Sequence, residues 1–342
     1  MKRPLPNISV LLPAFNAEKY IELAIQSILN QTYSNFELII LNDGSSDRTE
    51  EIIKSFKDTR VIYIKNEQNI GLVNTLNKGL SLAKGKYIAR MDADDISYIY
   101  RFSKQHSFLE NNPSYIICSS SRKDFNDSNN RDHISYMPVS DSAIRISSIF
   151  SPPFTHPAVM FRKDVILKNN LFYDENFKYS EDYEFWIRLL EYGKGYNFKE
   201  VLLAYRNTPG SQTFNGAKDF ECRKKTISSI QSKALKSLGI EFNTDELYFI
   251  FYLSLSDYTR QINFNKYSIK FIQTFFYKME ANLSLRFKNS TVSFILGKRY
   301  LKILLLNRNR MSFRQKLKLV FHKLTFFGLI YLIKERLALR GF

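Results

Sequence analysis

Short apolar runs alternate with amphipathic stretches along the first 120 residues of the chain. Four runs are brief and almost continuously apolar, as in strands that are buried on both faces of a parallel sheet: 8–12, 36–41, 61–64 and 87–91. Between them, apolar residues recur every three or four positions, which predicts helices over about 17–30, 47–56 and 71–83. Because strands joined by helical crossovers run parallel, the pattern predicts an α/β domain with a mostly parallel sheet and helices on both faces.

The fourth apolar run ends in a cluster of acidic residues. Asp92, Asp94 and Asp95 follow it directly, so we expect them at the carboxyl end of a strand, where open α/β sheets bind their ligands. Carboxylates this close repel one another unless a cation lies among them, and Mg²⁺ or Mn²⁺ accepts carboxylate, water and phosphate oxygens. Taken alone, such a triplet is more often a solvated acidic turn. The loops after the neighbouring strands favour the metal site.

Polar residues also follow two other predicted strands. Asn16 comes after run 8–12 and Asp43 after run 36–41, so both are expected at the same edge of the sheet. The alternative for Asp43 is that its side chain stabilises the Asn-Asp-Gly-Ser turn in which it lies. The chain has neither the G-x-G-x-x-G pattern of dinucleotide folds nor the G-K-[ST] of P-loops. A bound diphosphate would therefore depend on a metal rather than on a glycine-rich loop.

Four segments together resemble a known enzyme family. Residues 12–16, 42–47, 69–79 and 87–95 are similar, in order and spacing, to the motifs of the GT-A glycosyltransferase family 2. The resemblance extends over roughly residues 6–210 and implies the GT-A fold, which has a Rossmann-like, mostly parallel sheet. It makes residues 1–214 the catalytic domain, with a nucleotide-sugar half over about 1–120 and an acceptor half over about 121–214.

The resemblance also implies a nucleotide-sugar donor, most often a UDP-sugar. The implied donor-binding residues are Pro13, Ala14, Asn16, Asp43, Asn77, Arg90 and Asp92. Asp94 is the implied ligand of a Mn²⁺ or Mg²⁺ ion that holds the diphosphate. Asn77 and Arg90 are equally suited to helix-end, turn or salt-bridging roles.

A Glu-Asp pair opens a helix that is predicted further along the chain. Ser180 is the predicted N-cap, so Glu181 and Asp182 lie in the first turn, where an acid stabilises the helix dipole by about 0.3–1 kcal/mol. That structural role competes with a catalytic one. By the resemblance, Asp182 is the general base for the acceptor hydroxyl, and Glu181 lies near the acceptor or the phosphates. A base and a leaving diphosphate on opposite faces of the sugar imply inversion at the anomeric carbon.

Three more residues are candidates for positions near the acceptor or the phosphates. His156 matches a His-Pro segment of the family and is otherwise a capping or packing residue. Trp186, the only tryptophan, could stack on a sugar ring, although its place in an apolar helical stripe favours the core. Arg206 is either a supporting charge at the phosphates or an ordinary ion-pair partner. Thr208 stands where many family members have a histidine, which leaves the metal to Asp94, water and the diphosphate.

Positive charge is concentrated in the last third of the chain. The formal net charge is +17, yet residues 215–342 contain 24 Lys and Arg against 8 Asp and Glu, so the part before them is almost neutral. Phe, Tyr, Leu, Lys and Arg dominate this region, and its periodicity predicts a small bundle of helices. We therefore expect a separate basic, helical region over 215–342 with a partner of its own.

The last predicted helix, 313–340, has apolar residues along one side and basic residues mostly on the other. It either packs in the bundle with a solvated basic face or lies on an anionic membrane surface. We favour the membrane, because a glycosyltransferase without a spanning helix often has to reach a lipid-linked acceptor. The chain shows no signal peptide and no apolar run of about 18 residues. Its two cysteines lack the spacing of a disulfide scaffold or a zinc site. The expected location is the cytoplasm, at the periphery of the membrane.

The expected function is metal-dependent, inverting transfer of a hexosyl or N-acetylhexosaminyl group. The acceptor is a hydroxyl of a glycan or lipid-linked molecule in surface polysaccharide biosynthesis. One alternative is a catalytically degenerate family member that acts as a binding or scaffold protein, and the filled Asp94 and Asp182 positions count against it. A nucleic-acid-binding protein with a basic tail is another, but it leaves the acid-bearing loops unexplained, so no nucleic-acid partner is expected.

Overall fold

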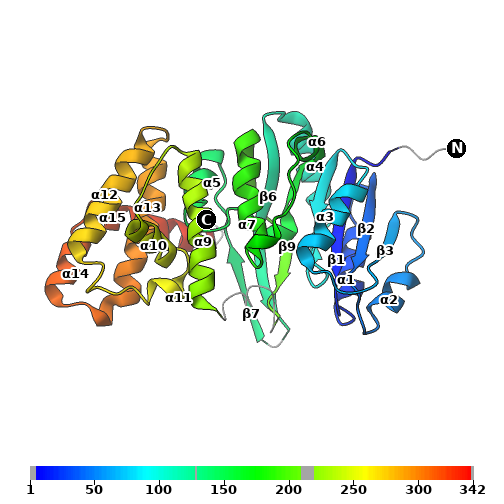
Figure 1. Ribbon diagram of the computed structural model, residues 1–342, viewed down its shortest axis with the longest axis horizontal. Coiled ribbons are helices and arrows are strands. Elements are labelled where there is room, and N and C mark those ends of the chain that lie inside the picture. Colours follow the sequence, from blue (N-terminus) through cyan, green and yellow to red (C-terminus); the bar gives the residue numbers. More distant parts are fainter. Residues whose placement is uncertain (1–4, 128, 209–218, 340–342) are drawn as a thin grey trace. The chain divides into compact units, whose positions relative to one another are not determined.

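The chain divides into two compact units, which Figure 1 shows in a computed structural model that describes residues 5–127, 129–208 and 219–339. The first unit comprises Met1–Ser140 and Phe154–Lys218, and the second comprises Asp141–Pro153 and Asp219–Phe342. The sequence boundary predicted between residues 214 and 215 falls outside the described residues.

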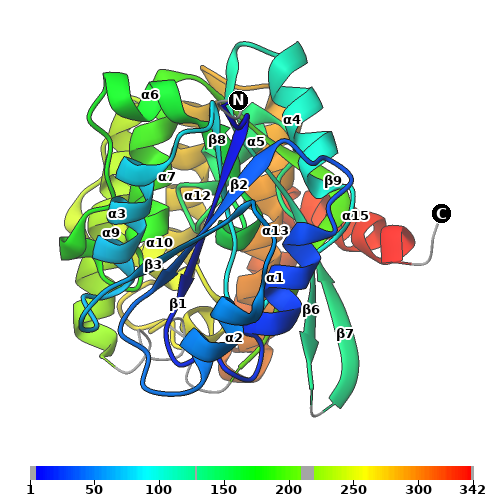
Figure 2. The same ribbon diagram turned by 90° about the vertical axis from the view of Figure 1, so that its right-hand side faces the viewer.

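The first unit is built on one mixed sheet. Its strands are β1 Ile8–Ala14, β2 Phe36–Asn42, β3 Val61–Lys65, β4 Tyr87–Arg90, β5 Ile96–Ser97, β6 Tyr115–Asn126, β7 Asn129–Ser135, β8 Met160–Arg162 and β9 Lys194–Arg206. Their order is β3-β2-β1-β4-β8-β6-β9-β5, and β7 pairs with β6 as the long ribbon seen in Figure 2. Strands β1 to β4 are mutually parallel, as predicted, while β8 joins β4 and β6 antiparallel. The parallel set places the carboxyl ends of β1, β2 and β4 at one edge of the sheet.

Helices cover both faces of this sheet. The helices of the unit are α1 Ile21–Leu29, α2 Thr49–Ser55, α3 Leu72–Leu82, α4 Arg101–Asn111, α6 Lys163–Lys168 and α7 Glu181–Leu189, with short 3₁₀ turns η1 His156–Ala158, η2 Glu175–Phe177 and η3 Leu190–Tyr192. Val10 and Leu12 of β1 pack with the apolar stripe of α1, whereas Leu11 lies against α3 at Gly79. Successive strand residues point to opposite faces, so the apolar run of β1 is buried from both sides. The predicted α/β fold class is confirmed.

The second unit is helical and has its own core. It contains α5 Asp141–Ser147, α9 Phe220–Ser237, α10 Thr244–Tyr252, α11 Ser256–Thr259, α12 Ile269–Ser284, α13 Asn289–Asn307, the turn η4 Arg308–Arg310, α14 Phe313–Val320 and α15 Lys323–Leu339. Residues 141–153, which the sequence analysis assigned to the first domain, belong here. The physical reason is that Ile146, Ile149 and Phe150 are buried among the apolar residues of the C-terminal helices.

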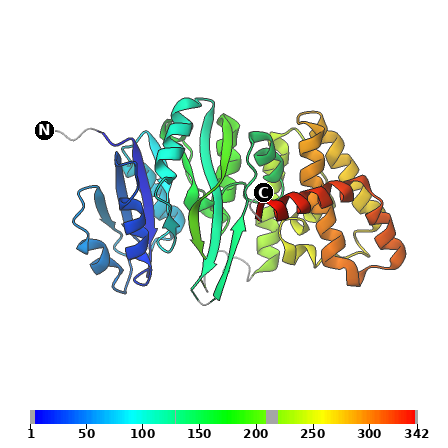
Figure 3. The same ribbon diagram turned by 180° about the vertical axis from the view of Figure 1, so that it is seen from behind.

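The predicted single helix over 313–340 is wrong, because it is two helices. The chain turns at Phe321 and His322, and the His322 Nδ1 accepts a hydrogen bond from the Leu324 N–H at the start of α15. Helix α15, red in Figure 3, then packs on α13, where Gly297 and Gly328 meet: a Cβ at Gly328 would lie 2.5 Å from the Gly297 carbonyl oxygen. Among the described residues, no helix has the length and apolar character needed to cross a bilayer.

Candidate active site

Three carboxylates converge directly after β4. Asp92, Asp94 and Asp95 each place an oxygen within 4.8 Å of the others. Asp92 and Asp94 are half-buried, and Asp95 is fully buried with an Oδ2 that has no hydrogen-bond partner among the described residues. A buried, unpartnered carboxylate oxygen beside two more carboxylates is the donor set that a hard divalent cation requires. The residues present therefore fit the predicted Mn²⁺ or Mg²⁺ site.

The electrostatics of this cluster agree with that fit. Burial, and then repulsion from Asp92, raise the pKa of Asp94 from 3.8 to about 6. Burial and the charges of Asp92 and Asp94 raise the pKa of Asp95 well above its ordinary value. Burial and mutual repulsion thus outweigh the positive charge of Arg90, so further positive charge would stabilise the ionised carboxylates. A cation bound here would supply it.

Arg90 is a buried guanidinium group beside these acids. It forms an ion pair with Asp92 and is 3% exposed. Its Nε and Nη1 have no hydrogen-bond partner among the described residues. Arg101, fully buried, donates to the carbonyl oxygens of Arg90 (2.8 Å) and Val159 (3.1 Å) and so supports the end of β4. Two buried, unsatisfied donors on a cationic side chain are suited to bind an anionic oxygen.

Arg206, predicted as a charge at the phosphates, is engaged by the protein. Its backbone N–H donates to the Asp95 Oδ1 (2.8 Å), and its Nε donates to the Asp94 carbonyl oxygen (2.8 Å). It also forms an ion pair with Asp127. The Thr208 hydroxyl donates to the Asp94 Oδ2 at 3.3 Å. The end of β9 therefore shapes the acidic loop, and Arg206 positions the carboxylates rather than standing free for a phosphate.

Asn16 and Asp43 connect the loops after β1 and β2. The Asn16 Oδ1 accepts from the Ser46 N–H at 2.9 Å, and Asn16 has a φ of 47°, which asparagine tolerates better than most residues. Pro13 and Ala14 form the buried end of β1, where the Ala14 carbonyl accepts from the Asp43 N–H at 2.8 Å. The structure thus gathers four of the predicted donor-binding residues, Pro13, Ala14, Asn16 and Asp43, at one edge of the sheet.

Asp43 itself is buried and already bonded. Its carboxylate accepts from Asn66 Nδ2 and Ile70 N–H, both at 2.9 Å, and from Gly71 N–H at 3.0 Å. It holds the 66–71 loop against the end of β2. The Asp43 side chain is thus structural, but the loop that it stabilises is 66–71 and not the Asn-Asp-Gly-Ser turn of the alternative given above. A contact between Asp43 and the nucleotide-sugar donor would come in addition to these three hydrogen bonds.

A second group of polar side chains surrounds Asp182 at the start of α7. The His156 Nδ1 lies 4.0 Å from the Asp182 Oδ2, and the His156 Nε2 lies 3.1 Å from the Tyr173 hydroxyl. Ser180 is the N-cap, as predicted, although its hydroxyl donates to the Tyr179 carbonyl instead of capping α7. Burial, with Arg90 nearby, lowers the pKa of His156 well below its ordinary value, so the ring is neutral.

Electrostatic coupling connects Asp182 and Glu181 with the metal-site acids. Burial and then repulsion from Asp182 raise the pKa of Glu181 to about 7, while the positive charge of Arg90 acts to lower it. After burial and the opposing effect of Arg90, the charges of Asp182, Glu181 and Asp92 all raise the pKa of Tyr173. Arg90 and Tyr173 thus each interact electrostatically with both sets of carboxylates. The two sets of carboxylates therefore share electrostatic partners.

Two predicted site residues have structural roles instead. Asn77 makes both of its amide contacts with the backbone of Tyr173, donating to its carbonyl and accepting from its N–H at 2.9 Å each. Trp186 is fully buried and packs edge-on against Phe154, Phe161 and Phe185. Asn77 therefore orders the Tyr173 segment, and Trp186 cannot stack on a sugar. The apolar stripe of α7 had favoured this second outcome.

Tyr173 and Asp127 contribute to the site without having been predicted. Tyr173 is 96 residues from Asn77 and lies in no motif, and Asp127 lies in a polar loop at the tip of the β6–β7 ribbon. Only the tertiary contacts with His156 and Arg206 reveal them. The sequence around Tyr173 offers only an aromatic pair, Phe172 and Tyr173, followed by two acids.

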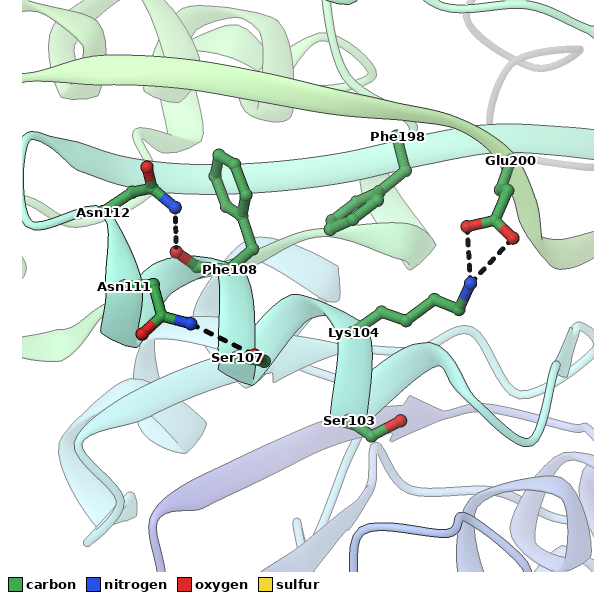
Figure 4. A pocket seen from close by; sticks show the side chains of 8 residues that line it. All are labelled: Ser103, Lys104, Ser107, Phe108, Asn111, Asn112, Phe198 and Glu200. Atoms are coloured by element: carbon green, nitrogen blue, oxygen red, sulfur yellow. Dashed lines mark hydrogen bonds and ion pairs between the residues drawn. The ribbon is translucent and has the colours of Figure 1, made fainter.

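A shallow pocket of about 500 Å³ lies elsewhere on the first unit, between α4 and β9. Figure 4 shows Phe108 and Phe198 facing each other across it and Lys104 paired with Glu200. It shares no residue with the acidic cluster. Its ion pair, between Lys104 and Glu200, joins two partly exposed side chains.

Comparisons with known proteins identify the family of the chain. The family model described as glycosyl transferase family 2 matches residues 9–169. An uncharacterized glycosyltransferase of Haemophilus influenzae is 34% identical over 289 residues, which are 77% of this chain and 88% of that protein. The Escherichia coli protein WfaP, named UDP-Glc:alpha-D-GlcNAc-diphosphoundecaprenol beta-1,3-glucosyltransferase, is 32% identical over 246 residues, 68% of this chain and 87% of that protein.

Among solved structures, S. aureus TarS 1-349 in complex with UDP-GlcNAc matches with a TM-score of 0.59 and 16% identity, over 92% of this chain and 89% of that one. At this identity the likeness concerns the fold alone. The Haemophilus relative, by contrast, is similar along most of both chains. The protein therefore belongs to glycosyl transferase family 2.

Proposed function

We propose that this glycosyltransferase moves a sugar from a UDP-sugar to a hydroxyl of a glycan or lipid-linked acceptor in surface polysaccharide biosynthesis, with inversion at the anomeric carbon. One observation carries the proposal. Arg90 and Tyr173 each interact electrostatically with carboxylates of both groups, the Asp92–Asp95 cluster and the Glu181–Asp182 pair. The arrangement gives a leaving diphosphate and an attacking alcohol separate groups of carboxylates.

On the donor side, the loops after β1 and β2 hold the nucleoside. Pro13, Ala14 and Asn16 form the wall at the end of β1, and Asp43 keeps the 66–71 loop in place beside it. Arg90 presents two unsatisfied donors to an anionic oxygen of the diphosphate. Charge-assisted hydrogen bonds of this kind are roughly twice as strong as neutral ones.

Asp94, with Asp92 and Asp95, would hold a Mn²⁺ or Mg²⁺ ion. When bound, such an ion neutralises charge that develops on a departing diphosphate. Asp94 is half-buried and so more open to an incoming ion than the buried Asp95. Arg206 keeps the Asp94–Asp95 backbone in position.

On the acceptor side, Asp182 takes the proton of the attacking hydroxyl. A carboxylate positioned as general base contributes about 10²–10⁴-fold to the rate. His156 lies against Asp182 and is held in turn by Tyr173. Because His156 is neutral, it orients the carboxylate without competing for its charge.

The named relatives support the donor and acceptor classes. The name of WfaP gives UDP-Glc as its donor and a diphosphoundecaprenol-linked sugar as its acceptor, and TarS was solved with UDP-GlcNAc. We extend the UDP-sugar and the lipid-linked acceptor to this chain on that basis. A lipid-linked acceptor places the protein at a membrane surface, which its basic C-terminal region suits.

The test is a screen of nucleotide sugars by thermal shift with and without Mn²⁺, followed by transfer assays with the donor that is found. We expect a metal-dependent shift with one UDP-sugar. Asp182→Asn should keep UDP affinity and lose transfer by at least about 10²-fold. The matched control is Asp164→Asn, which changes an exposed acid of α6. Transfer by Asp182→Asn at the parent rate would show that the base is another residue, and no turnover with any nucleotide sugar would favour the scaffold alternative.

A further inference from the structure

Helix α14 exposes its apolar residues instead of burying them. Phe313 is 74% exposed, and Phe321, directly after the helix, is 83% exposed. Leu317 and Val320, which lie between them, are exposed as well. At about 100° per residue, these four side chains fall within an arc of about 100°. The amphipathic pattern in this segment is therefore real, and its apolar stripe faces solvent.

The core contact of α14 lies on the opposite side. Leu319 is the one fully buried residue of the helix and lies about 150° from the centre of the exposed stripe. A capping box starts the helix, in which Ser312 and Gln315 exchange side-chain and backbone hydrogen bonds. The helix is thus formed and attached without burying its apolar stripe, so the stripe is available to a partner.

Basic residues border the stripe on both sides. By the same helical geometry, Arg314 and Lys318 lie along one edge and Lys316 along the other. Within the described part of the chain, no carboxylate forms an ion pair with any of the three. The sequence around them has no Asp or Glu from residue 281 to residue 334, against twelve Lys and Arg. A partner must therefore accept apolar side chains at its centre and cations at its rim.

We propose that this surface docks on an anionic phospholipid bilayer. We define the α14 face as Phe313, Leu317, Val320 and Phe321 with the bordering cations Arg314, Lys316 and Lys318. Interfacial helices insert an apolar face to a depth of about 5–10 Å while basic residues at the border reach lipid phosphates. The inference rests on the membrane placement in the proposed function, and it is separable from the sugar-transfer chemistry.

The charge of the α14 face favours an anionic bilayer over a second copy of the chain or a nucleic acid. A second copy of the chain would bring another acid-free, basic segment against the first, and the like charges would repel. A nucleic acid would satisfy the cations, but it would leave the aliphatic Leu317 and Val320 in contact with phosphate or water. Helix α15 repeats the pattern, with Phe326, Leu329 and Ile333 exposed within an arc of about 60°.

The experiment is co-sedimentation of the full chain with vesicles of phosphatidylcholine alone or with 30% phosphatidylglycerol, compared with a variant that carries Phe313→Ser and Phe321→Ser. We expect the parent to pellet with the anionic vesicles and the double variant to partition at least tenfold less. Both side chains are mostly exposed, so the variant should retain the circular dichroism melt of the parent. The matched control, Leu23→Ser with Leu167→Ser, removes two exposed apolar side chains from the first unit and should bind like the parent.

Three outcomes would overturn the inference. The first is that the parent does not bind anionic vesicles. The second is that Arg314→Gln with Lys318→Gln abolishes binding while the double phenylalanine variant binds fully, since the contact would then be charge alone. The third is a concentration-dependent dimer that the phenylalanine variant dissociates, which would assign the α14 face to a second copy. Transfer to a water-soluble acceptor should be unchanged in the phenylalanine variant, so failure of docking and failure of the proposed function are distinguishable.

Discussion

Glu181 offers the sharpest test of the electrostatics at the site. It lies 6% exposed beside Asp182, and burial followed by repulsion from Asp182 raises its pKa from 4.5 to about 7. The folded protein therefore binds a proton at Glu181 more tightly than the unfolded chain does. Stability falls as the pH rises through the window from 4.5 to about 7 and is flat above it. A protonated Glu181 adds no charge beside Asp182, which suits the assignment of Asp182 as the base.

The perturbation is Glu181→Gln, which keeps the size of the side chain and cannot ionise. Each unit by which the pKa of Glu181 in the folded protein exceeds its pKa in the unfolded chain corresponds to about 1.36 kcal/mol. Ionisation of Glu181 therefore destabilises the fold by about 3 kcal/mol at pH 8.5 and by about 1 kcal/mol at pH 5. The variant should therefore be more stable than the parent, and its advantage should grow by about 2 kcal/mol between these pH values.

Urea unfolding followed by tryptophan fluorescence measures this difference. The only tryptophan, Trp186, is buried in α7, so the signal reports on the first unit. Glu67→Gln, at an exposed position, is the control and should show no pH-dependent gain. An advantage of Glu181→Gln that is equal at the two pH values, or larger at pH 5, would refute the reasoning.

Three further predictions concern the metal site, the support of the base and the second unit. Asp94→Asn should reduce at least tenfold the increase in UDP affinity that Mn²⁺ causes, as measured by calorimetry with and without Mn²⁺, while UDP affinity without metal stays the same. If Mn²⁺ raises the UDP affinity of this variant as much as that of the parent, Asp94 is not the metal ligand. His156→Gln should reduce kcat about tenfold with little change in the KM of the donor, because it removes the imidazole that lies between Tyr173 and Asp182. A change confined to the KM would contradict a positioning role. Gly328→Val should destabilise the second unit by about 1–3 kcal/mol through overpacking against Gly297, as seen in circular dichroism melts, while unfolding monitored by Trp186 fluorescence is unaffected. An unchanged melt would show that helices α13 and α15 tolerate a wider separation.

The sheet and its acid-bearing edge were predictable because they depend on local pattern. The run 87–91 is apolar, short and followed by three acids, and strand β4 with the Asp92–Asp95 cluster is found there. Parallel pairing then follows from the helical crossovers, so the placement of Asn16, Asp43 and the cluster at one edge needed no knowledge of long-range contacts.

The partners of individual side chains were not predictable in the same way. Asn77 was a candidate for the donor, yet its amide is taken up by Tyr173, which is distant in the sequence. Arg206 had two candidate roles, at the phosphates or in an ion pair, and it holds the Asp94–Asp95 loop and pairs with Asp127. Each such pairing depends on which backbone and side-chain groups the fold brings within about 3 Å, and no periodicity in the sequence encodes that.

The C-terminal region shows the same division. Apolar spacing correctly identified an amphipathic segment beginning at Phe313. It did not show that the helix ends at Val320, that α15 packs through Gly328, or that the α14 stripe points away from the core. Helical periodicity defines an apolar face but is silent about what covers that face.

The sequence by itself determined the α/β class, the carboxylates at the strand ends and the basic, helical character of the C-terminal region, because these follow from residue type and spacing along the chain. Only the tertiary structure decided that Arg90 and Tyr173 interact with both sets of acids, that Trp186 belongs to the core and that residues 141–153 pack with the second unit. The physical reason is that hydrophobic periodicity acts over a few residues, whereas burial and pKa are set by groups that chain folding brings together from distant positions.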